Sequence, residues 1–150
     1  MKNNKKHNSL CILFFFGYIG VLVYFLFFAE MLGRTSVHRD YSYNLVLFKE
    51  INRFIKYRKI LGEAAVWLNL FGNVAAFIPF GGFVPIVIKK EAGLWQIIFI
   101  TAVFSLIIEC VQLVLRVGSF DVDDILLNTI GGFIGAVIFF VYRKLSKSIK

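Results

Sequence analysis

The sequence contains few charged residues, and this scarcity argues against a soluble protein. Only 17% of its 150 residues are Asp, Glu, Lys or Arg, whereas a soluble domain usually carries about a quarter. Hydrophobic residues make up 59% of the chain, and the mean hydropathy is +0.76. These apolar residues are arranged in long runs, which predicts a single-domain protein that crosses a membrane several times.

The residue patterns of the common metal and catalytic sites are also missing. The chain has two cysteines, Cys11 and Cys110, which form no C-x-x-C pair, and its two histidines lie in polar segments. H-E-x-x-H, G-x-S-x-G and P-loop motifs are absent as well. A zinc or haem site is therefore unsupported, and we expect neither a metal nor a cofactor.

The basic balance of the chain does not indicate nucleic acid. The net charge is +8, but the Lys and Arg residues lie in short segments between and beyond the apolar runs. This distribution is typical of membrane proteins, in which basic loops set the orientation. We therefore predict no nucleic-acid partner.

Four apolar runs predict an all-α integral membrane bundle of four transmembrane helices. About 20 apolar residues are needed to cross the hydrocarbon layer. The first run is too long for a signal peptide, whose apolar part has about 7–15 residues. We place residues 1–9 in a basic arm, 10–142 in the membrane domain and 143–150 in a basic tail. The predicted spans are Leu10 to Ala29, Ala64 to Ile88, Leu94 to Leu115 and Ile125 to Tyr142. In the second span, Pro79 predicts a kink or a break.

The longest polar segment, Gly33 to Gly62, joins the first two spans. Apolar and basic residues alternate in it at close to helical spacing, which predicts an amphipathic helix near residues 44–58 lying among the lipid headgroups. The other interpretation is a solvated loop folded against the bundle.

The predicted topology follows from the basic residues of the loops. The side of the termini carries nine Lys and Arg against eight on the opposite side. Because both termini are basic and the turn 116–124 is net acidic, we expect both termini in the cytoplasm.

Polar residues in the apolar runs are the candidate functional residues. A charge at the centre of a bilayer costs about 2.5–3.5 kcal/mol on insertion scales, so such residues are candidates by default. Ser105, Glu109, Gln112 and Arg116 recur at i, i+4, i+7 and i+11, which places them on one helical face. We predict an inward-facing cluster in the outer half of the bilayer, made of Asn73, Glu109, Gln112, Arg116, Asp124 and Asn128.

Each candidate also has a structural interpretation. Glu109 either bonds to Asn73 or Asn128 between helices, or it moves a proton or binds a cation. Gln112 either joins two helices or contacts a ligand, and Arg116 either reaches to headgroups or clamps a lipid phosphate. Asp121 either caps the last helix or binds a ligand. If the protein is an enzyme, the catalytic pair is Glu109 and Asp124. The ligand-binding candidates are Asn73, Gln112, Arg116, Asp121 and Asn128.

Four segments carry a resemblance to a known family. They are N-L-V-L-F-K-E-I at 44–51, N-V-A-A-F-I-P-F-G at 73–81, S-L-I-I-E-C-V-Q at 105–112 and R-V-G-S-F-D-V-D-D-I-L-L-N-T-I-G at 116–131. In this order they resemble the VanZ-like family of small bacterial membrane proteins, over roughly residues 44–140. The chain has Leu47 where the family often has Pro. The resemblance implies a multi-pass protein of the bacterial cytoplasmic membrane. The namesake of the family is associated with resistance to teicoplanin, a lipoglycopeptide that acts on cell-wall precursors outside the cell.

The resemblance carries no reaction, so three classes of function stay open. The first is a non-catalytic envelope protein that binds an amphiphile of the outer leaflet. The second is a membrane enzyme that uses Glu109 and Asp124 on a lipid-like substrate. The third is a small transporter subunit, suggested by the interrupted second span. The expected partners are membrane lipids, a lipid-linked cell-wall precursor or a lipoglycopeptide, and the oligomeric state stays open.

Overall fold

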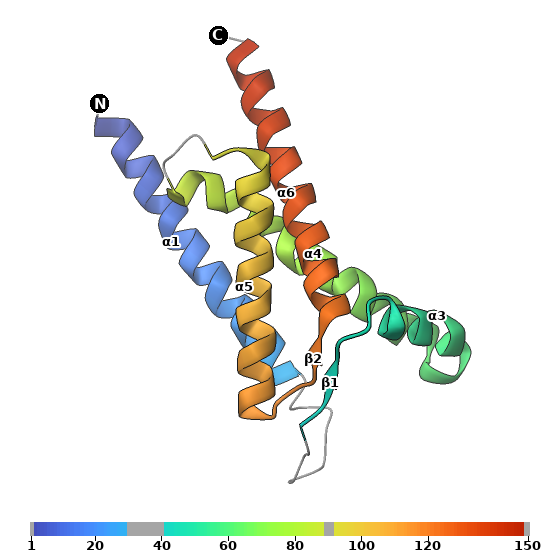
Figure 1. Cartoon of the computed structure of the whole chain (residues 1–150). Helices are drawn as coiled ribbons and strands as arrows, with labels where there is room; N and C mark the ends of the chain where they lie inside the picture. Colours follow the sequence, from blue (N-terminus) through green and yellow to red (C-terminus); the bar gives the residue numbers. More distant parts are fainter. Residues whose placement is uncertain (1, 30–40, 89–91, 149–150) are drawn as a thin grey trace.

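Four long helices dominate the computed structural model, which describes residues 2–29, 41–88 and 92–148 (Figure 1). All four are long and apolar enough to cross a membrane, as the sequence predicted. The first helix continues into a π-helix, and the last helix extends into the basic tail. The helices are α1 (Lys2–Tyr24) with the π-helix η1 (Phe25–Ala29), α4 (Glu63–Ile88), α5 (Leu94–Leu115) and α6 (Val122–Ser148).

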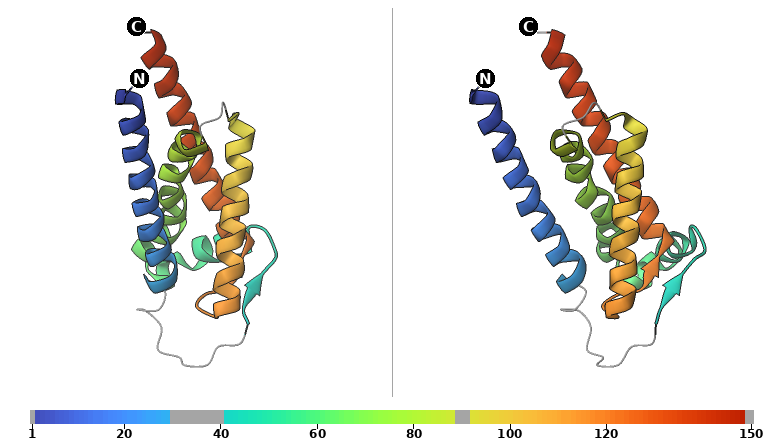
Figure 2. Two further views of the ribbon diagram at one scale, coloured as in Figure 1. Left: turned by 90° about the vertical axis from the view of Figure 1, so that its left-hand side faces the viewer. Right: turned by 60° about the vertical axis from the view of Figure 1, so that its left-hand side comes forward.

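The bundle has two different ends. The first turn of α1 and the last turn of α6 lie at one end, as an even number of crossings requires (Figures 1 and 2). At the opposite end lie η1, the end of α5, the start of α6 and a shorter helix, α3 (Lys49–Leu61), which projects sideways. We call this second end the loop end.

Helices α4 and α6 are in close contact through glycines. A Cβ atom added at Gly81 would overlap the backbone carbonyl of Gly132, and one added at Gly131 would overlap the carbonyl of Val74. Because transmembrane helices gain little from the hydrophobic effect, small residues that let backbones approach are a main source of their association. These glycines therefore allow the backbones of α4 and α6 to pack closely.

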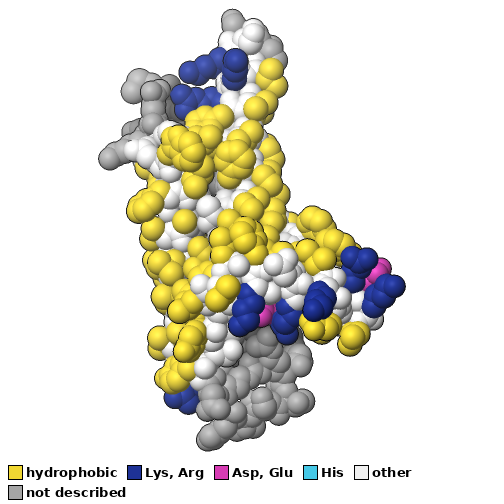
Figure 3. All heavy atoms as spheres, turned by 45° about the vertical axis from the view of Figure 1, so that its right-hand side comes forward, with side chains coloured by type: hydrophobic (Ala, Val, Ile, Leu, Met, Phe, Trp, Pro, Cys, Tyr) yellow, Lys and Arg dark blue, Asp and Glu magenta, His cyan; other side chains and the backbone are white. Residues whose placement is uncertain are grey.

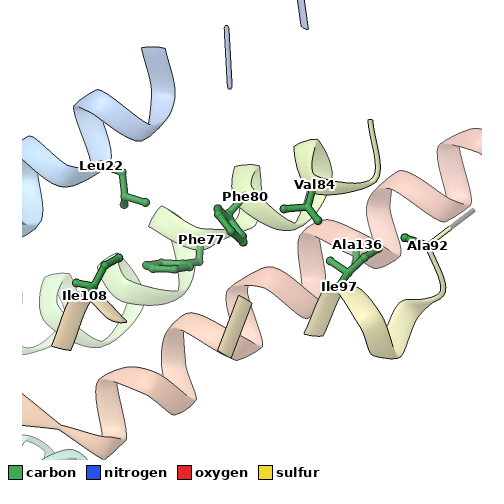
Figure 4. Packing of buried hydrophobic residues seen from close by; sticks show 8 residues of the cluster. All are labelled: Leu22, Phe77, Phe80, Val84, Ala92, Ile97, Ile108 and Ala136. Atoms are coloured by element: carbon green, nitrogen blue, oxygen red, sulfur yellow. The ribbon is translucent and has the colours of Figure 1, made fainter. Parts of the chain in front are cut away.

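Aromatic side chains fill the space between α4 and α5. The rings of Phe80 and Phe104 are stacked with centroids 4.6 Å apart, and Phe77 is fully buried beside them. Figure 4 shows the buried apolar side chains in one row along the bundle, from Ile108 and Leu22 to Ala92.

Of the kink or break predicted at Pro79, the break is absent, because α4 continues through both Pro79 and Pro85. The hydroxyl of Tyr18 in α1 donates a hydrogen bond of 2.5 Å to the carbonyl oxygen of Ala76, in the turn before Pro79. This bond links α1 to α4 one turn before the proline, whose missing N–H leaves the carbonyl of Ala75 without a donor in the helix.

Two very short strands close the loop end. Strand β1 (Tyr43–Asn44) pairs in parallel with β2 (Phe120–Asp121), so that Asn44 lies opposite Asp121. The all-α prediction is confirmed for the bundle, but this pair was not predicted. The amphipathic helix begins at Lys49 rather than near residue 44, because β1 occupies the preceding residues.

Candidate functional site

The polar face predicted on α5 is buried over most of its length. Thr101, Ser105, Glu109 and Gln112 are all buried and lie on the face of α5 that meets the other helices. Arg116 departs from this face and is exposed. It occupies the C-cap of α5 with a left-handed φ of 55°. Because the helix ends there, the helical spacing no longer predicts the direction of its side chain.

Glu109 joins α5 to the start of α6. The residue is 3% exposed, and its Oε2 accepts a hydrogen bond of 2.9 Å from the backbone N–H of Asp121. The first N–H groups of a helix lack partners within the helix and carry partial positive charge. A buried carboxylate at this position is therefore stabilised by the start of α6.

Asp121 caps α6 and contacts β1. Its Oδ1 accepts a hydrogen bond of 2.9 Å from the backbone N–H of Asp123, which is the geometry of a helix N-cap. The same oxygen accepts a bond of 3.0 Å from Nδ2 of Asn44. Burial raises the pKa of the Asp121 carboxyl, and these two bonds partly oppose the increase.

Asp123 is a key residue that the sequence analysis did not single out. It is 1% exposed, and its carboxylate accepts hydrogen bonds from three backbone N–H groups at the start of α3: Phe48, Glu50 at 2.8 Å and Ile51 at 3.2 Å. Asp123 thus attaches α3 to α6. The only signal in the sequence was that D-V-D-D, at residues 121–124, contains three acidic residues, whereas the start of one helix needs only one capping residue.

Two asparagine side chains form hydrogen bonds between helices deeper in the bundle. Nδ2 of Asn73 donates a bond of 2.6 Å to Asp124 and so joins α4 to α6. Nδ2 of Asn128 donates a bond of 2.9 Å to the hydroxyl of Ser105 and so joins α6 to α5. Such bonds hold membrane helices together.

Gln112 satisfies the backbone of the π-helix. Its Nε2 donates a hydrogen bond of 2.9 Å to the carbonyl oxygen of Leu26 in η1. A π-helix changes the pairing of backbone groups, and an unpaired carbonyl inside a membrane is costly. The bond therefore attaches the end of α1 to α5, which is the helix-joining role considered for Gln112.

Arg116 has its charged group at the surface of the loop end. Its guanidinium carbon lies 4.4 Å from the centroid of the Tyr41 ring, a cation–π contact. A cation at the C-terminus of α5 is also favoured by the helix dipole. Arg116 is thus held in place and exposed, with its planar group open to an anion.

Among the described residues, the members of the predicted cluster take part in different contacts. The structure brings Glu109 to Asp121, Asn73 to Asp124 and Asn128 to Ser105, whereas Gln112 and Arg116 make separate contacts. Within the part of the chain that the structure describes, no three His, Cys, Asp or Glu side chains are grouped to hold a metal ion. What the arrangement offers chemically is the exposed guanidinium of Arg116, in the same turn as the buried, hydrogen-bonded carboxyl group of Asp121.

Comparisons with known proteins agree with the resemblance read from the sequence. The model of the VanZ/LLP1 family matches residues 15–143. Protein VanZ of Enterococcus faecium is 33% identical over 76 residues, which cover 51% of this chain and 47% of that protein. The match thus spans about half the length of this curated relative. No solved structure matches the chain. Because the family model covers most of the chain, this multi-pass membrane protein belongs to the VanZ/LLP1 family.

Proposed function

We propose that this protein binds an amphiphile of the outer leaflet at the loop end of the bundle and thereby protects a bacterium against teicoplanin-type lipoglycopeptides. The observation that carries the proposal is the exposed guanidinium of Arg116, held by Tyr41 beside a buried acidic turn. The association with teicoplanin is that of the family's namesake, and it extends to this chain as part of the proposal.

The proposal includes an orientation in the bacterial cytoplasmic membrane. Both termini lie in the cytoplasm, where basic segments adjoining spans are favoured. The common position of the ends of α1 and α6 supports a shared side (Figure 1). The loop end then faces outside, and α3 lies in the headgroup region, with exposed basic and apolar residues suited to it.

The headgroup of the amphiphile would bind Arg116. A guanidinium pairs with a phosphate or carboxylate through two parallel hydrogen bonds. The buried acids Glu109 and Asp121 would hold the turn beneath it, through the bond between them. Because glycines bring α4 and α6 into close contact, the tail would lie on the lipid-facing surface. A lipid-linked cell-wall precursor or the lipoglycopeptide itself has the required anionic and apolar parts.

Removal of the cation tests this proposal. Wild type, Arg116→Ala and Arg116→Lys would be expressed in a teicoplanin-susceptible bacterium, with membrane abundance measured for each. We expect loss of protection in Arg116→Ala and partial retention in Arg116→Lys, because Lys keeps the charge but not the planar fork. Lys144→Ala, an exposed cation near the opposite end, is the matched control and should protect fully.

Native mass spectrometry of the same purified variants would compare their bound lipids. The recognition role fails if wild type protects and Arg116→Ala, at equal abundance, changes neither the protection nor the bound lipids.

The two other classes of function have less support. An enzyme would need a carboxylate that reaches substrate, but Glu109 is 3% exposed and bonded to the start of α6. Under the enzyme hypothesis, Glu109→Gln should abolish protection at normal abundance; under our proposal it should be tolerated.

The transporter hypothesis depended on an interrupted second span, and α4 continues through Pro79. Substrate-dependent flux in vesicles would revive it.

A further inference from the structure

Helix α3 carries a row of exposed basic residues on one face. Lys49, Arg53 and Lys56 recur at i, i+4 and i+7, and all three are exposed. Residues spaced in this way share a helical face. The opposite side of α3 is turned toward the protein, since Glu50, Ile51 and Phe54 are half-buried. Figure 3 shows the basic side chains in a row along this projecting helix, beside hydrophobic surface.

Apolar surface adjoins the basic row. Ile60 is 82% exposed and Leu61 42% exposed at the end of α3. The start of α4, which packs on α3, exposes Trp67, Leu68 and Phe71. The apolar surface thus runs from α3 onto a helix that crosses the membrane. A nucleic acid or a free phosphate would neutralise the cations and leave this apolar surface in water, whereas a lipid bilayer satisfies both.

Contacts between rings and cations also fit the headgroup layer. The guanidinium carbon of Arg53 lies 5.1 Å from the ring centroid of Phe54, and Nζ of Lys56 lies 5.5 Å from that of Tyr57. Aromatic rings with an apolar body and basic side chains that extend toward phosphate are both enriched at this depth of a bilayer. Glu50 forms an ion pair with Arg53, so within the row Lys49 and Lys56 carry most of the unbalanced charge.

The orientation of the row is set by Asp123. The start of a helix is a ready anion-binding site, and in α3 it is already occupied by the Asp123 carboxylate, which accepts from Phe48, Glu50 and Ile51. An external anion therefore meets the side chains of the row rather than the end of the helix. Because Asp123 lies in the first turn of α6, it also fixes which face of α3 points away from the bundle.

We propose that α3 is a docking surface for anionic phospholipid headgroups, such as phosphatidylglycerol, and that Asp123 is the positioning residue that orients it. This inference rests on the proposed location of α3 at the membrane surface. It is independent of whether Arg116 recognises an amphiphile or whether the protein protects against an antibiotic.

Lipid selectivity tests the basic row. The purified protein would be equilibrated with equal amounts of phosphatidylglycerol and phosphatidylcholine of identical acyl chains, and the bound lipids counted by native mass spectrometry. We expect Lys49→Gln/Lys56→Gln to lower the affinity for phosphatidylglycerol about fivefold per charge, the equivalent of ~1 kcal/mol per charge. Lys49→Arg/Lys56→Arg keeps both charges and should bind as wild type does. An unchanged ratio in the Gln variant would overturn the proposal. A dimer that the Gln substitutions dissolve would overturn it too, by assigning the row to a second copy.

Asp123→Asn tests the positioning role. An amide can accept from the N–H groups of α3 with one oxygen only, so α3 should lose its fixed orientation. In a background without Cys11 and Cys110, a spin label at Ile60→Cys would report the depth and mobility of α3 in nanodiscs of phosphatidylglycerol and phosphatidylcholine. We expect greater mobility and a severalfold loss of selectivity in Asp123→Asn, in a bundle that remains folded at the temperature of the measurement. Asp123→Glu keeps both oxygens and should restore part of the selectivity. Selectivity retained in a mobile α3 would refute the role of Asp123.

The depth of the label distinguishes two hypotheses: the location of α3 at the membrane surface, and its preference for anionic phospholipid. A label at residue 60 that lies far from the headgroup layer would contradict the proposed location of α3, and with it this inference. A label at headgroup depth, combined with no preference for phosphatidylglycerol, would reject the inference alone and leave the location intact.

Discussion

Glu109 in α5 accepts a hydrogen bond from the backbone N–H of Asp121, so that a carboxylate within one membrane span holds the residue that caps the next span. The two residues are separated by twelve positions, and the turn between them contains Arg116. The bond therefore holds together the two ends of the turn that contains Arg116, and with them the start of α6.

We expect Glu109→Ala to destabilise the bundle and Glu109→Gln to be tolerated. Alanine would leave the N–H of Asp121 buried without an acceptor, which costs about 1–3 kcal/mol, whereas the Gln side chain still offers an oxygen. Thermal unfolding of the purified variants in one detergent would measure the difference. Equal destabilisation by both substitutions would show that the charge of Glu109, rather than its oxygen, is what the fold requires.

The contact between α4 and α6 predicts opposite effects for two glycines. Gly131→Ala places a methyl group against the backbone carbonyl of Val74 in α4, and overpacking of this kind costs about 1–3 kcal/mol. Gly72→Ala is the control, since a Cβ there would meet no atom within 4 Å. It should stabilise α4 by about 0.5–1 kcal/mol. Unfolding midpoints that fall for both variants would contradict the close contact.

Asp121 predicts a pH dependence of stability. Burial raises the pKa of its carboxyl above the ordinary value of 3.8, so the folded protein binds this proton more tightly than the unfolded chain. Asp121 therefore contributes fully to the stability below the ordinary pKa of the unfolded chain. This contribution is lost as the pH rises through the raised pKa of the folded protein. Asp121→Asn has no such proton and should therefore become progressively more stable relative to wild type as the pH is raised above 3.8. Melting temperatures that differ by a constant amount over this range would exclude the effect.

Much of the fold could be predicted because its signals are local. Apolar runs predicted the spans, and helical spacing predicted the buried face of α5 that contains Glu109 and Gln112. The prediction that Arg116 faces the bundle was wrong for a local reason. Arg116 is the left-handed C-cap of α5, so the helical periodicity used to place its side chain no longer applies there.

The contacts around α3 could not be predicted, because they join distant parts of the chain. Asp123 and the N–H of Phe48 are separated by 75 positions, and Asn44 and Asp121 by 77. Neither pair has a spacing that any helical or strand pattern would reveal. The break expected at Pro79 is absent as well, since α4 continues through this residue.

The proposed orientation predicts which positions can be labelled from outside the cell. In a background without Cys11 and Cys110, a membrane-impermeant thiol reagent should label Ile60→Cys, at the exposed end of α3. Lys150→Cys should stay unlabelled until the membrane is opened. Labelling of Lys150→Cys in intact cells would place the termini outside and reverse the topology.

The bond between Asn73 and Asp124 predicts a measurable coupling between α4 and α6. The two side chains approach to 2.6 Å and lie on helices that are already in close contact through glycines. A double-mutant cycle of Asn73→Ala and Asp124→Ala isolates their interaction from the rest of the interface. Hydrogen bonds between membrane helices average about 0.6 kcal/mol and reach about 1.7 kcal/mol in such cycles, because the separated helices also find partners. A pair that shares one short bond in a half-buried position should fall in this range. A coupling of zero would mean that each residue has an alternative partner of equal strength, and the bond would then be excluded as a link between the two helices.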